Sequence, residues 1–274
     1  MDTSGREPCA VVRCRHMTVV ALVLLGCASP REEPTEPRGV TERFPTGHAD
    51  VASGGLVASY DMTTLTAEGL LRDFSGRGSH GRVSGTVVTS GVRGGARLFG
   101  AATDRVELPP RRDFDLNGPL SIAVWFRFDR EGQHQHLVAC DDKFSVWLTP
   151  DDHLRFGNAF GEGLETTTSL SSETWHSVIG IFRDTAGAEL DDANVEVWVD
   201  GSQAPSTIVW FGRGDGPIRW RQGTLYERDA CYIGFESHQG QARHQRLPFF
   251  GAIDELLIFE RALTQAEVQA LAGT

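Results

Sequence analysis

From Leu56 onward the chain consists of short segments in which apolar and polar residues alternate, and no other feature constrains its fold as strongly. In Leu120–Phe128 the residues Ile122, Val124, Phe126 and Phe128 fall on one face. Gly, Asp and Asn separate the segments, and no helix of ordinary length is expected before Thr264. Period-two alternation between turn residues is typical of antiparallel strands, so the chain is predicted to form a β-sandwich. The other segments with this pattern are Leu137–Cys140, Phe144–Leu148, Trp175–Phe182, Ala193–Asp200 and Tyr232–Gly234.

The last part of the chain, Phe250–Val268, reads as a strand followed by one short helix. The strand carries an acidic pair and ends at Glu260-Arg261. Thr264 and Glu267 have the spacing of a capping box, in which a hydroxyl and a carboxylate bond the free amides of a helix start. The helix is therefore expected to begin at Thr264.

This closing segment resembles the last strand and terminal helix of the laminin-G-like (concanavalin A-like) jellyroll family. Other segments resemble motifs of the same family, in the same order along the chain, and together the likeness covers about residues 56–274. It implies an all-β fold, an antiparallel β-sandwich jellyroll with one short C-terminal helix. The matching segments are Val57–Asp61, Asp73–Gly81, Gly94–Gly100, Asp104–Pro109, Thr174–Val178 and Val197–Gly201.

The beginning of the chain resembles a targeting segment. Met17–Leu25 is apolar but too short to span a bilayer, and it follows Arg13 and Arg15. Leu24-Leu25-Gly26-Cys27 resembles a bacterial lipobox, which implies that residues 1–26 are a signal peptide and that Cys27 is lipidated. A plain cleaved signal peptide is the alternative, and translation from Met17 would remove the basic flank.

The expected organisation has three parts. After the signal peptide, residues 27–55 would hold the lipidated cysteine and a disordered linker, because they are rich in Pro, Glu, Thr and Arg and poor in apolar residues. Residues 56–274 would be the jellyroll domain. We expect an exported, membrane-anchored lipoprotein of the bacterial cell envelope.

Charge and cysteine content narrow the choice of partners. The formal net charge is −11, and Lys143 is the only lysine. An acidic surface repels phosphate backbones, so nucleic acid is not expected as a partner. Cys140 and Cys231 would remain in an oxidising compartment after Cys9 and Cys14 leave with the signal peptide, and they could form a disulfide. Their distance cannot be judged from the sequence.

The fold also hosts glycoside hydrolases, whose paired carboxylates lie on alternate residues of one strand. In the last strand, alternation would place Asp254 on the face of Ala252 and Leu256, and Glu255 on the opposite face. We find no other strand with the required pattern, and no H-E-x-x-H or G-x-S-x-G motif. The chain is therefore predicted not to be an enzyme.

Calcium is a possible cofactor at two places. The family lays its first and last strands side by side, which implies that Asp61 and Asp254 could share a structural calcium ion. A partial likeness to the pentraxins implies a weaker site at Asp141, Asp142 and Glu236. Turn capping or an arginine partner for Asp254, and a solvated acidic loop neutralised by Lys143, are the alternatives.

The insertion between Val209 and Asp229 offers a candidate ligand surface. It contains Trp210, Trp220 and Arg219, and aromatic planes and guanidinium groups suit sugars. A hairpin whose aromatic side chains pack on the sheet is the alternative. A second candidate rim contains His238 and Arg243.

We therefore expect a non-catalytic laminin-G-like recognition module that binds a glycan or a partner protein at the cell surface, possibly with calcium. The alternatives are a glycan-active hydrolase or lyase on the same jellyroll and a purely structural envelope protein.

Overall fold

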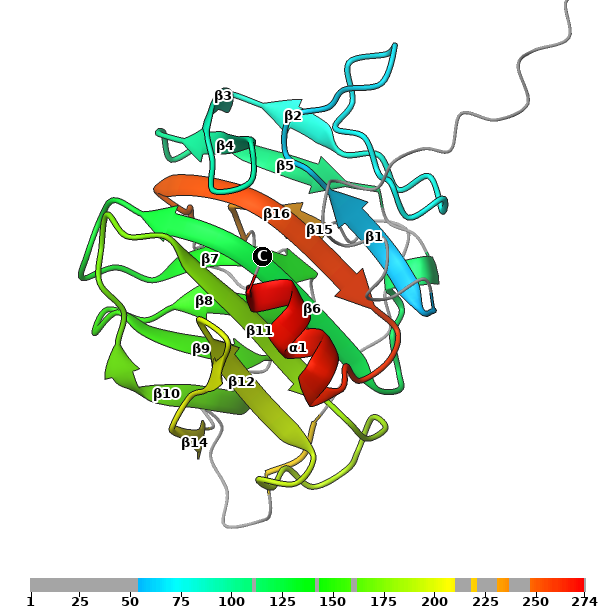
Figure 1. Cartoon of the computed structure of the whole chain (residues 1–274), viewed down its shortest axis with the longest axis vertical. Helices are drawn as coiled ribbons and strands as arrows, with labels where there is room; N and C mark the ends of the chain where they lie inside the picture. The colour runs from blue at the N-terminus through cyan, green and yellow to red at the C-terminus, as the bar shows by residue number, and fades with distance from the viewer. Residues whose placement is uncertain are drawn as a thin grey trace, which may run out of the picture. The chain divides into compact units, whose positions relative to one another are not determined.

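A computed structural model describes residues 54–109, 112–140, 143–158, 162–209, 218–220, 231–236 and 247–273 of the chain. These residues form two antiparallel β-sheets and one short helix at the C-terminal end (Figure 1). The predicted all-β sandwich with one C-terminal helix is confirmed. None of the described helices is both long enough and apolar enough to cross a bilayer.

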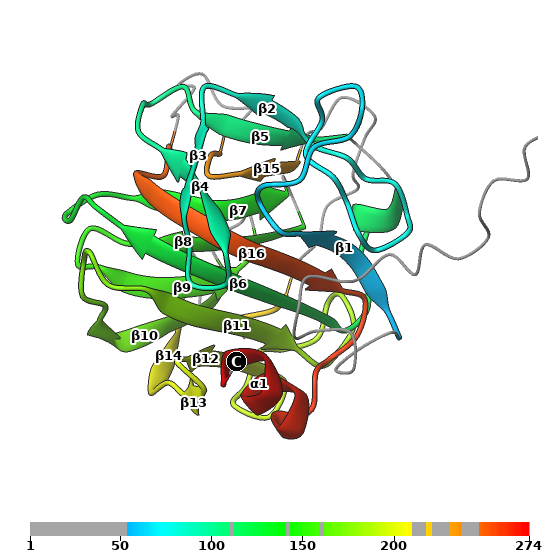
Figure 2. The same ribbon diagram turned by 45° about the horizontal axis from the view of Figure 1, so that its top comes forward.

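The first sheet has the strand order β13-β12-β11-β6-β16-β4-β3. One edge of β16 pairs with β6, and the other edge pairs with β4 and then with β1 (Figure 2). The last strand therefore lies at the middle of this sheet. The strands are β1 (Leu56–Tyr60), β3 (Val87–Ser90), β4 (Gly95–Phe99), β6 (Leu120–Phe128), β11 (His176–Phe182), β12 (Val195–Val199), β13 (Ser202–Gln203) and β16 (Gly251–Phe259).

The second sheet has the strand order β14-β10-β9-β8-β7-β15-β5-β2. A single 3-10 turn, η1 (Arg112–Phe114), precedes β6 of the first sheet. The strands are β2 (Arg82–Ser84), β5 (Arg105–Leu108), β7 (Gln135–Cys140), β8 (Phe144–Leu148), β9 (His153–Gly157), β10 (Gly163–Ser169), β14 (Ser206–Val209) and β15 (Cys231–Ile233).

The core lies between the two sheets and follows the alternation seen in the sequence. On β6 the four residues predicted to share a face are all in this core, and on β12 the side chains of Val195 and Val197 are buried there. Burying a side chain of this size contributes about 1.5–3 kcal/mol, so two apolar sheet faces hold the layers together. The four β6 residues are Ile122, Val124, Phe126 and Phe128.

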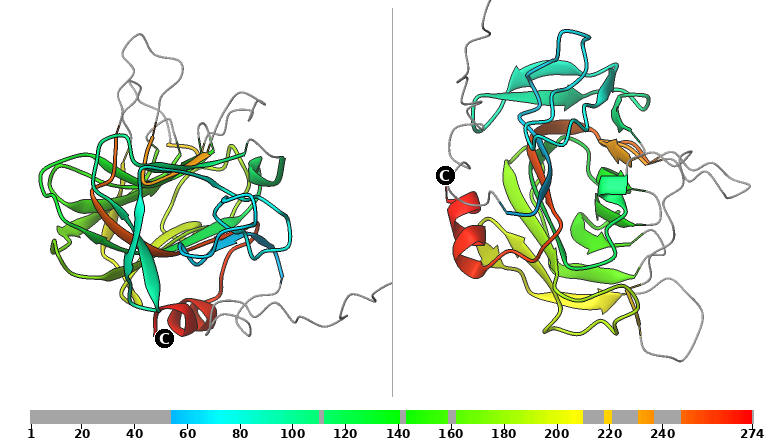
Figure 3. Two further views of the ribbon diagram at one scale, coloured as in Figure 1. Left: turned by 90° about the horizontal axis from the view of Figure 1, so that it is seen from above. Right: turned by 90° about the vertical axis from the view of Figure 1, so that its right-hand side faces the viewer.

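The helix α1 (Gln265–Ala272) covers part of the outer face of the first sheet (Figure 3). Val268 and Leu271 pack there with Ile179, Trp198 and Leu257 in a second apolar cluster. The helix α1 therefore shields part of the outer face of the first sheet from solvent.

The predicted capping box of α1 is confirmed. The backbone amide of Glu267 donates to the Thr264 hydroxyl, and the amide of Thr264 donates to the Glu267 carboxylate at 2.7 Å. Arg261 also donates to this carboxylate at 2.6 Å. Chiefly because of Arg261, the pKa of Glu267 falls to about 2.

One expectation for β16 is wrong. The pairing of β16 with β6 shifts register between Ile253 and Leu256, a β-bulge that breaks strict alternation. Both acidic side chains consequently reach the same residue. The amide of Arg93 donates to Asp254 at 2.8 Å, and its guanidinium pairs with Glu255 at 3.2 Å. Asp254 and Glu255 therefore do not follow the predicted alternation between opposite faces of β16.

Candidate functional site

The outer face of the second sheet carries a row of large polar and aromatic side chains that crosses five strands. In the strand register His136 lies opposite Trp147, Trp147 opposite Arg155, Arg155 opposite Glu165, and Glu165 opposite Thr207. Their neighbours along β8 and β9 belong to the core, so alternation points this row away from the core.

The members of this row lock one another in place. The imidazole of His136 stacks on the indole of Trp147, with centroids 5.4 Å apart and planes at 5°. The guanidinium of Arg155 lies 5.6 Å from the same indole and donates to Glu165 from Nε at 2.6 Å and from Nη2. His153 lies 3.3 Å from the other oxygen of Glu165. Such contacts fix side-chain orientation before any ligand arrives.

His136 is also held from both ring nitrogens. Its Nδ1 lies 2.8 Å from the hydroxyl of Ser145, which itself contacts the carbonyl of Val138 at 3.2 Å. Its Nε2 lies 2.8 Å from the carboxylate of Glu236. Both ring nitrogens of this buried imidazole therefore have polar partners.

A second row with mostly small side chains runs beside the first. In register it contains Tyr232, Ala139, Ser145, Gly157 and Gly163. A Cβ atom on Gly157 would lie only 2.2 Å from the backbone oxygen of Glu162, the residue directly before β10. The close approach of β9 and β10 therefore requires glycine at this position. The face thus places aromatic and charged side chains next to a stretch of small ones.

Accessibility increases along the first row. The side chains of His136 and Arg155 are 7% and 9% exposed, whereas those of Glu165 and His153 are 19% and 26% exposed. A molecule from solvent would therefore meet the Glu165 end first.

The structure sorts the predicted ligand residues into different environments. Glu236 belongs to this face through His136. Trp220 does not: its indole is fully buried, stacked on Phe182 at 4.5 Å and 12°. The prediction that Trp220 contacts a ligand is therefore wrong, because its side chain packs in the hydrophobic core.

Among the other predicted ligand residues, the structure describes only Arg219, which donates to the carbonyl of Gly187 at 3.1 Å. The residues Cys27, Asp141, Asp142, Trp210, His238 and Arg243 lie outside the described residues.

The two carboxylates predicted to share calcium each accept hydrogen bonds from nearby loops. Asp61 accepts from the amides of Thr63 at 3.0 Å and Thr64 at 2.8 Å, and Asp254 accepts from the amide of Arg93. Burial raises the pKa of Asp254 above its ordinary value. In the described ranges, no three His, Cys, Asp or Glu side chains are grouped so as to hold a metal ion.

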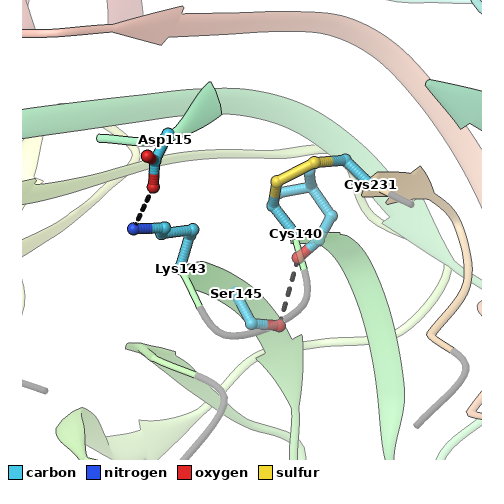
Figure 4. The surroundings of a disulfide bond; sticks show 6 residues. Asp115, Cys140, Lys143, Ser145 and Cys231 are labelled. Atoms are coloured by element: carbon cyan, nitrogen blue, oxygen red, sulfur yellow. Dashed lines mark hydrogen bonds and ion pairs between the residues drawn. A yellow bond between two sulfur atoms is a disulfide. The ribbon is translucent and has the colours of Figure 1, made fainter. Parts of the chain in front are cut away.

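Cys140 and Cys231 form a disulfide between β7 and β15, where they are direct cross-strand partners with Cα atoms 4.0 Å apart (Figure 4). Beside it Lys143 is buried and pairs with Asp115 (Figure 4). It also donates to Asn117 at 3.0 Å. The disulfide joins the strand of His136 to the strand next to it.

Sequence reasoning missed His136, Trp147, Arg155 and Glu165. The sequence held one sign of this row in Phe144–Leu148. There Trp147 alternates with the apolar residues and shares its face with Ser145. An aromatic residue on the polar phase of a strand is a candidate for a surface contact.

The fold and this face define a class of protein, the jellyroll β-sandwich. The sequence profile of the concanavalin A-like lectin/glucanases superfamily matches residues 99–269, and the chain belongs to this superfamily. The resemblance inferred from the motifs is therefore confirmed. No curated protein matches the sequence.

Several solved structures share the fold. Domain 4 of AbnA, a GH43 extracellular arabinanase from Geobacillus stearothermophilus solved with arabinotriose, is 19% identical with a TM-score of 0.56, covering 80% of this chain and 98% of that one. Trypanosoma rangeli sialidase with sialic acid is 14% identical with a TM-score of 0.54, covering 81% of this chain but 33% of the sialidase. The binding domain of Paraclostridial Mosquitocidal Protein 1 is 17% identical with a TM-score of 0.51, covering 80% and 52%.

Proposed function

We propose that this protein is a non-catalytic glycan-binding module whose ligand site is the outer face of the second sheet. The observation that carries the proposal is the row His136, Trp147, Arg155 and Glu165, in which an indole is fixed between an imidazole and a guanidinium–carboxylate pair.

The chemistry of this row suits a sugar. The Trp147 indole is only 5% exposed and lies between His136 and Arg155, so its role is to hold these polar side chains in place for a sugar. The guanidinium of Arg155 donates hydrogen bonds, and the carboxylate of Glu165 accepts them, so ring hydroxyls have partners of both kinds. A few fixed polar groups around an apolar surface are typical of ligand sites.

The direction of approach follows from the exposure of the row. Glu165 and His153 form its more accessible end, and we place the first contact of the glycan there. Two structures with the same fold are described with bound arabinotriose and with sialic acid, which supports a glycan as the ligand class. Neither of them selects which sugar this chain binds.

A glycan array with the purified protein tests the ligand class. We expect retention of one group of glycans and no release of reducing ends from the polysaccharides that carry them. Release of reducing ends would show a glycan-active enzyme, and Glu165→Gln and Glu236→Gln would then identify its carboxylates. Binding to no glycan on the array would contradict the proposal and favour a partner protein or a structural envelope role.

We also propose export and a lipid anchor at Cys27, on the strength of the apolar run that ends in Leu24-Leu25-Gly26-Cys27. Membrane fractionation of wild type and Cys27→Ser tests this. We expect Cys27→Ser to leave the membrane fraction, and an unchanged distribution would contradict the anchor.

Calcium remains a separate proposal. Binding at Asp61 and Asp254 would replace hydrogen bonds that these carboxylates now accept from backbone amides. An ion that binds only the folded chain adds about 2.7 kcal/mol at a hundredfold excess over its dissociation constant. Melting curves with calcium and with EDTA test this proposal, and identical curves would contradict calcium binding at Asp61 and Asp254.

A further inference from the structure

The chain contains a single lysine, Lys143, and the structure buries it. Every other residue among the 26 basic residues Lys and Arg is arginine. The side chain of Lys143 is only 1% exposed. A guanidinium stays protonated in proteins, whereas an amine that gives up its proton is a nucleophile. Lysine at this position therefore offers a reaction that arginine would not.

Two side chains of one short segment meet this amine. Nζ of Lys143 pairs with the carboxylate of Asp115 (Figure 4). It also donates to Oδ1 of Asn117 at 3.0 Å. The amide nitrogen of Asn117 in turn donates to the backbone carbonyl of Asp115 at 3.1 Å. The carboxamide of Asn117 is therefore held at both of its polar atoms, with its carbonyl oxygen on the amine.

Apolar residues flank both partners of the ion pair. Phe114 and Leu116, on either side of Asp115, and Phe144, directly after Lys143, belong to the core between the sheets. Burial penalises charge, so an ammonium and a carboxylate in contact can become an amine and a carboxylic acid by moving one proton. Asn117 lies at the surface, which gives a small product a way out.

We propose that Lys143 and Asn117 form an intramolecular isopeptide bond, with Asp115 as the general base and acid. Asp115 takes a proton from the ammonium, and the amine attacks Cγ of Asn117. As the bond from Cγ to the amide nitrogen breaks, Asp115 gives that nitrogen its proton and takes the second one from Nζ. Ammonia leaves and carries this last proton away as ammonium. A secondary amide between Nζ and Cγ is the product.

The isopeptide bond links the two sheets. Asn117 lies in the connection that leads to β6 of the first sheet, and Lys143 directly precedes β8 of the second sheet. The neighbouring disulfide of Cys140 and Cys231 joins two strands within the second sheet (Figure 4). The isopeptide bond is therefore a different kind of crosslink, which a reducing agent does not open.

Peptide mapping of the purified full chain tests this proposal. Cleavage after arginine, following reduction, separates Asp113–Arg127, which contains Asn117, from Glu131–Arg155, which contains Lys143. We expect the two peptides to stay linked, with a mass about 17 Da below their sum because one ammonia is lost. Fragmentation of the linked pair should place the bond between Lys143 and Asn117.

Two variants and one control separate the roles of the residues. Lys143→Arg keeps the positive charge without a nucleophilic amine, and Asp115→Asn keeps the shape of the side chain without the base. Both variants should yield the two peptides unlinked. Asn194→Ala is the matched control, because Asn194 also donates to a loop carbonyl, that of Glu189 at 2.7 Å. This control should leave the link intact.

An amine label gives an independent readout, because Lys143 is the only lysine. An acylating reagent added to the urea-unfolded wild type should leave Lys143 unlabelled, and it should label Lys143 in Asp115→Asn. Unlinked peptides with a labelled lysine from wild-type protein that had folded would overturn the proposal. An intact link in Asp115→Asn would also contradict it, as would a wild-type link about 18 Da below the sum, the loss of water at Asp115.

Discussion

His176 at the start of β11 binds Asp200 in the turn after β12, with Nδ1 of the imidazole 2.9 Å from the carboxylate. Its Nε2 lies 3.0 Å from the carbonyl of Ser171. Burial alone would lower the pKa of His176, but these two hydrogen bonds outweigh it and raise the pKa above its ordinary value. Despite burial, the bond to His176 lowers the pKa of Asp200.

We predict that this pair makes folding stability depend on pH. Because the pKa of His176 is raised on folding, its contribution is complete below 6.5 and is lost as pH rises through the raised value. Because the pKa of Asp200 is lowered, its contribution is complete above 3.8 and is lost as pH falls through the lowered value. Urea unfolding between pH 5 and about 9 should therefore show a decline on the alkaline side.

Asp200→Asn isolates the charge in that experiment, since asparagine also tolerates the positive φ of 49° at this position. Because the Asp200 side chain is 51% exposed and screened by solvent, we expect a loss of about 1 kcal/mol at pH 6 and a smaller alkaline decline than in wild type. An alkaline decline as steep as that of wild type would show that other groups cause it.

The capping box should stabilise the C-terminal helix in a pH-dependent way. Glu267→Gln removes the charge that binds Arg261, and we expect a loss of about 1 kcal/mol at pH 7. Since the folded pKa is about 2 against an ordinary 4.5, this contribution should vanish as pH falls through that range. Gln269→Ala, an exposed change in the same helix, is the control for helix propensity. Equal losses in the two variants would contradict a role for the cap.

Trp220 should behave as a core residue. Trp220→Ala is expected to cost about 3–5 kcal/mol, because it removes a fully buried indole stacked on Phe182. Trp220→Phe should recover much of that loss. Trp175→Ala, at a half-buried position, is the comparison and should cost far less. A Trp220→Ala protein that unfolds at the wild-type denaturant concentration would contradict the packing.

The disulfide between Cys140 and Cys231 should stabilise the second sheet. Replacing both cysteines with alanine is expected to lower the free energy of unfolding by about 2–4 kcal/mol, because the crosslink restricts the unfolded chain. A reducing agent should bring the wild type to the level of this variant and leave the variant unchanged. Equal stability of the oxidised wild type and the variant would show that the bond is absent in solution.

Most of the fold could be predicted because it depends on local patterns. The alternation in Leu120–Phe128 predicted which side chains of β6 enter the core, and the spacing of Thr264 and Glu267 predicted the cap of α1. Each of these signals lies within a single element. The order of the family motifs then indicated the jellyroll fold, whereas the order of the strands in each sheet was not predicted.

The candidate site could not be predicted in the same way, because its residues meet only through strand register. His136 and Trp147 lie on different strands, and their stacking depends on the pairing of β7 with β8, which includes a register shift after His136. The bulge at Asp254 likewise changes which way two carboxylates point. The residue type and position of Trp220 between Val209 and Asp229 did not reveal that its side chain is fully buried.

The most direct test of the proposed function compares Trp147→Ala with Trp175→Ala. Both remove an indole that lies under an arginine, Arg155 or Arg127, but Trp175 directly precedes β11 of the first sheet. Calorimetric titration with the best glycan from the array should show binding at least about tenfold weaker for Trp147→Ala, because His136 and Arg155 lose the indole that holds them in place. Trp175→Ala should bind as wild type does. Wild-type affinity in a folded Trp147→Ala protein would contradict a glycan site on the outer face of the second sheet.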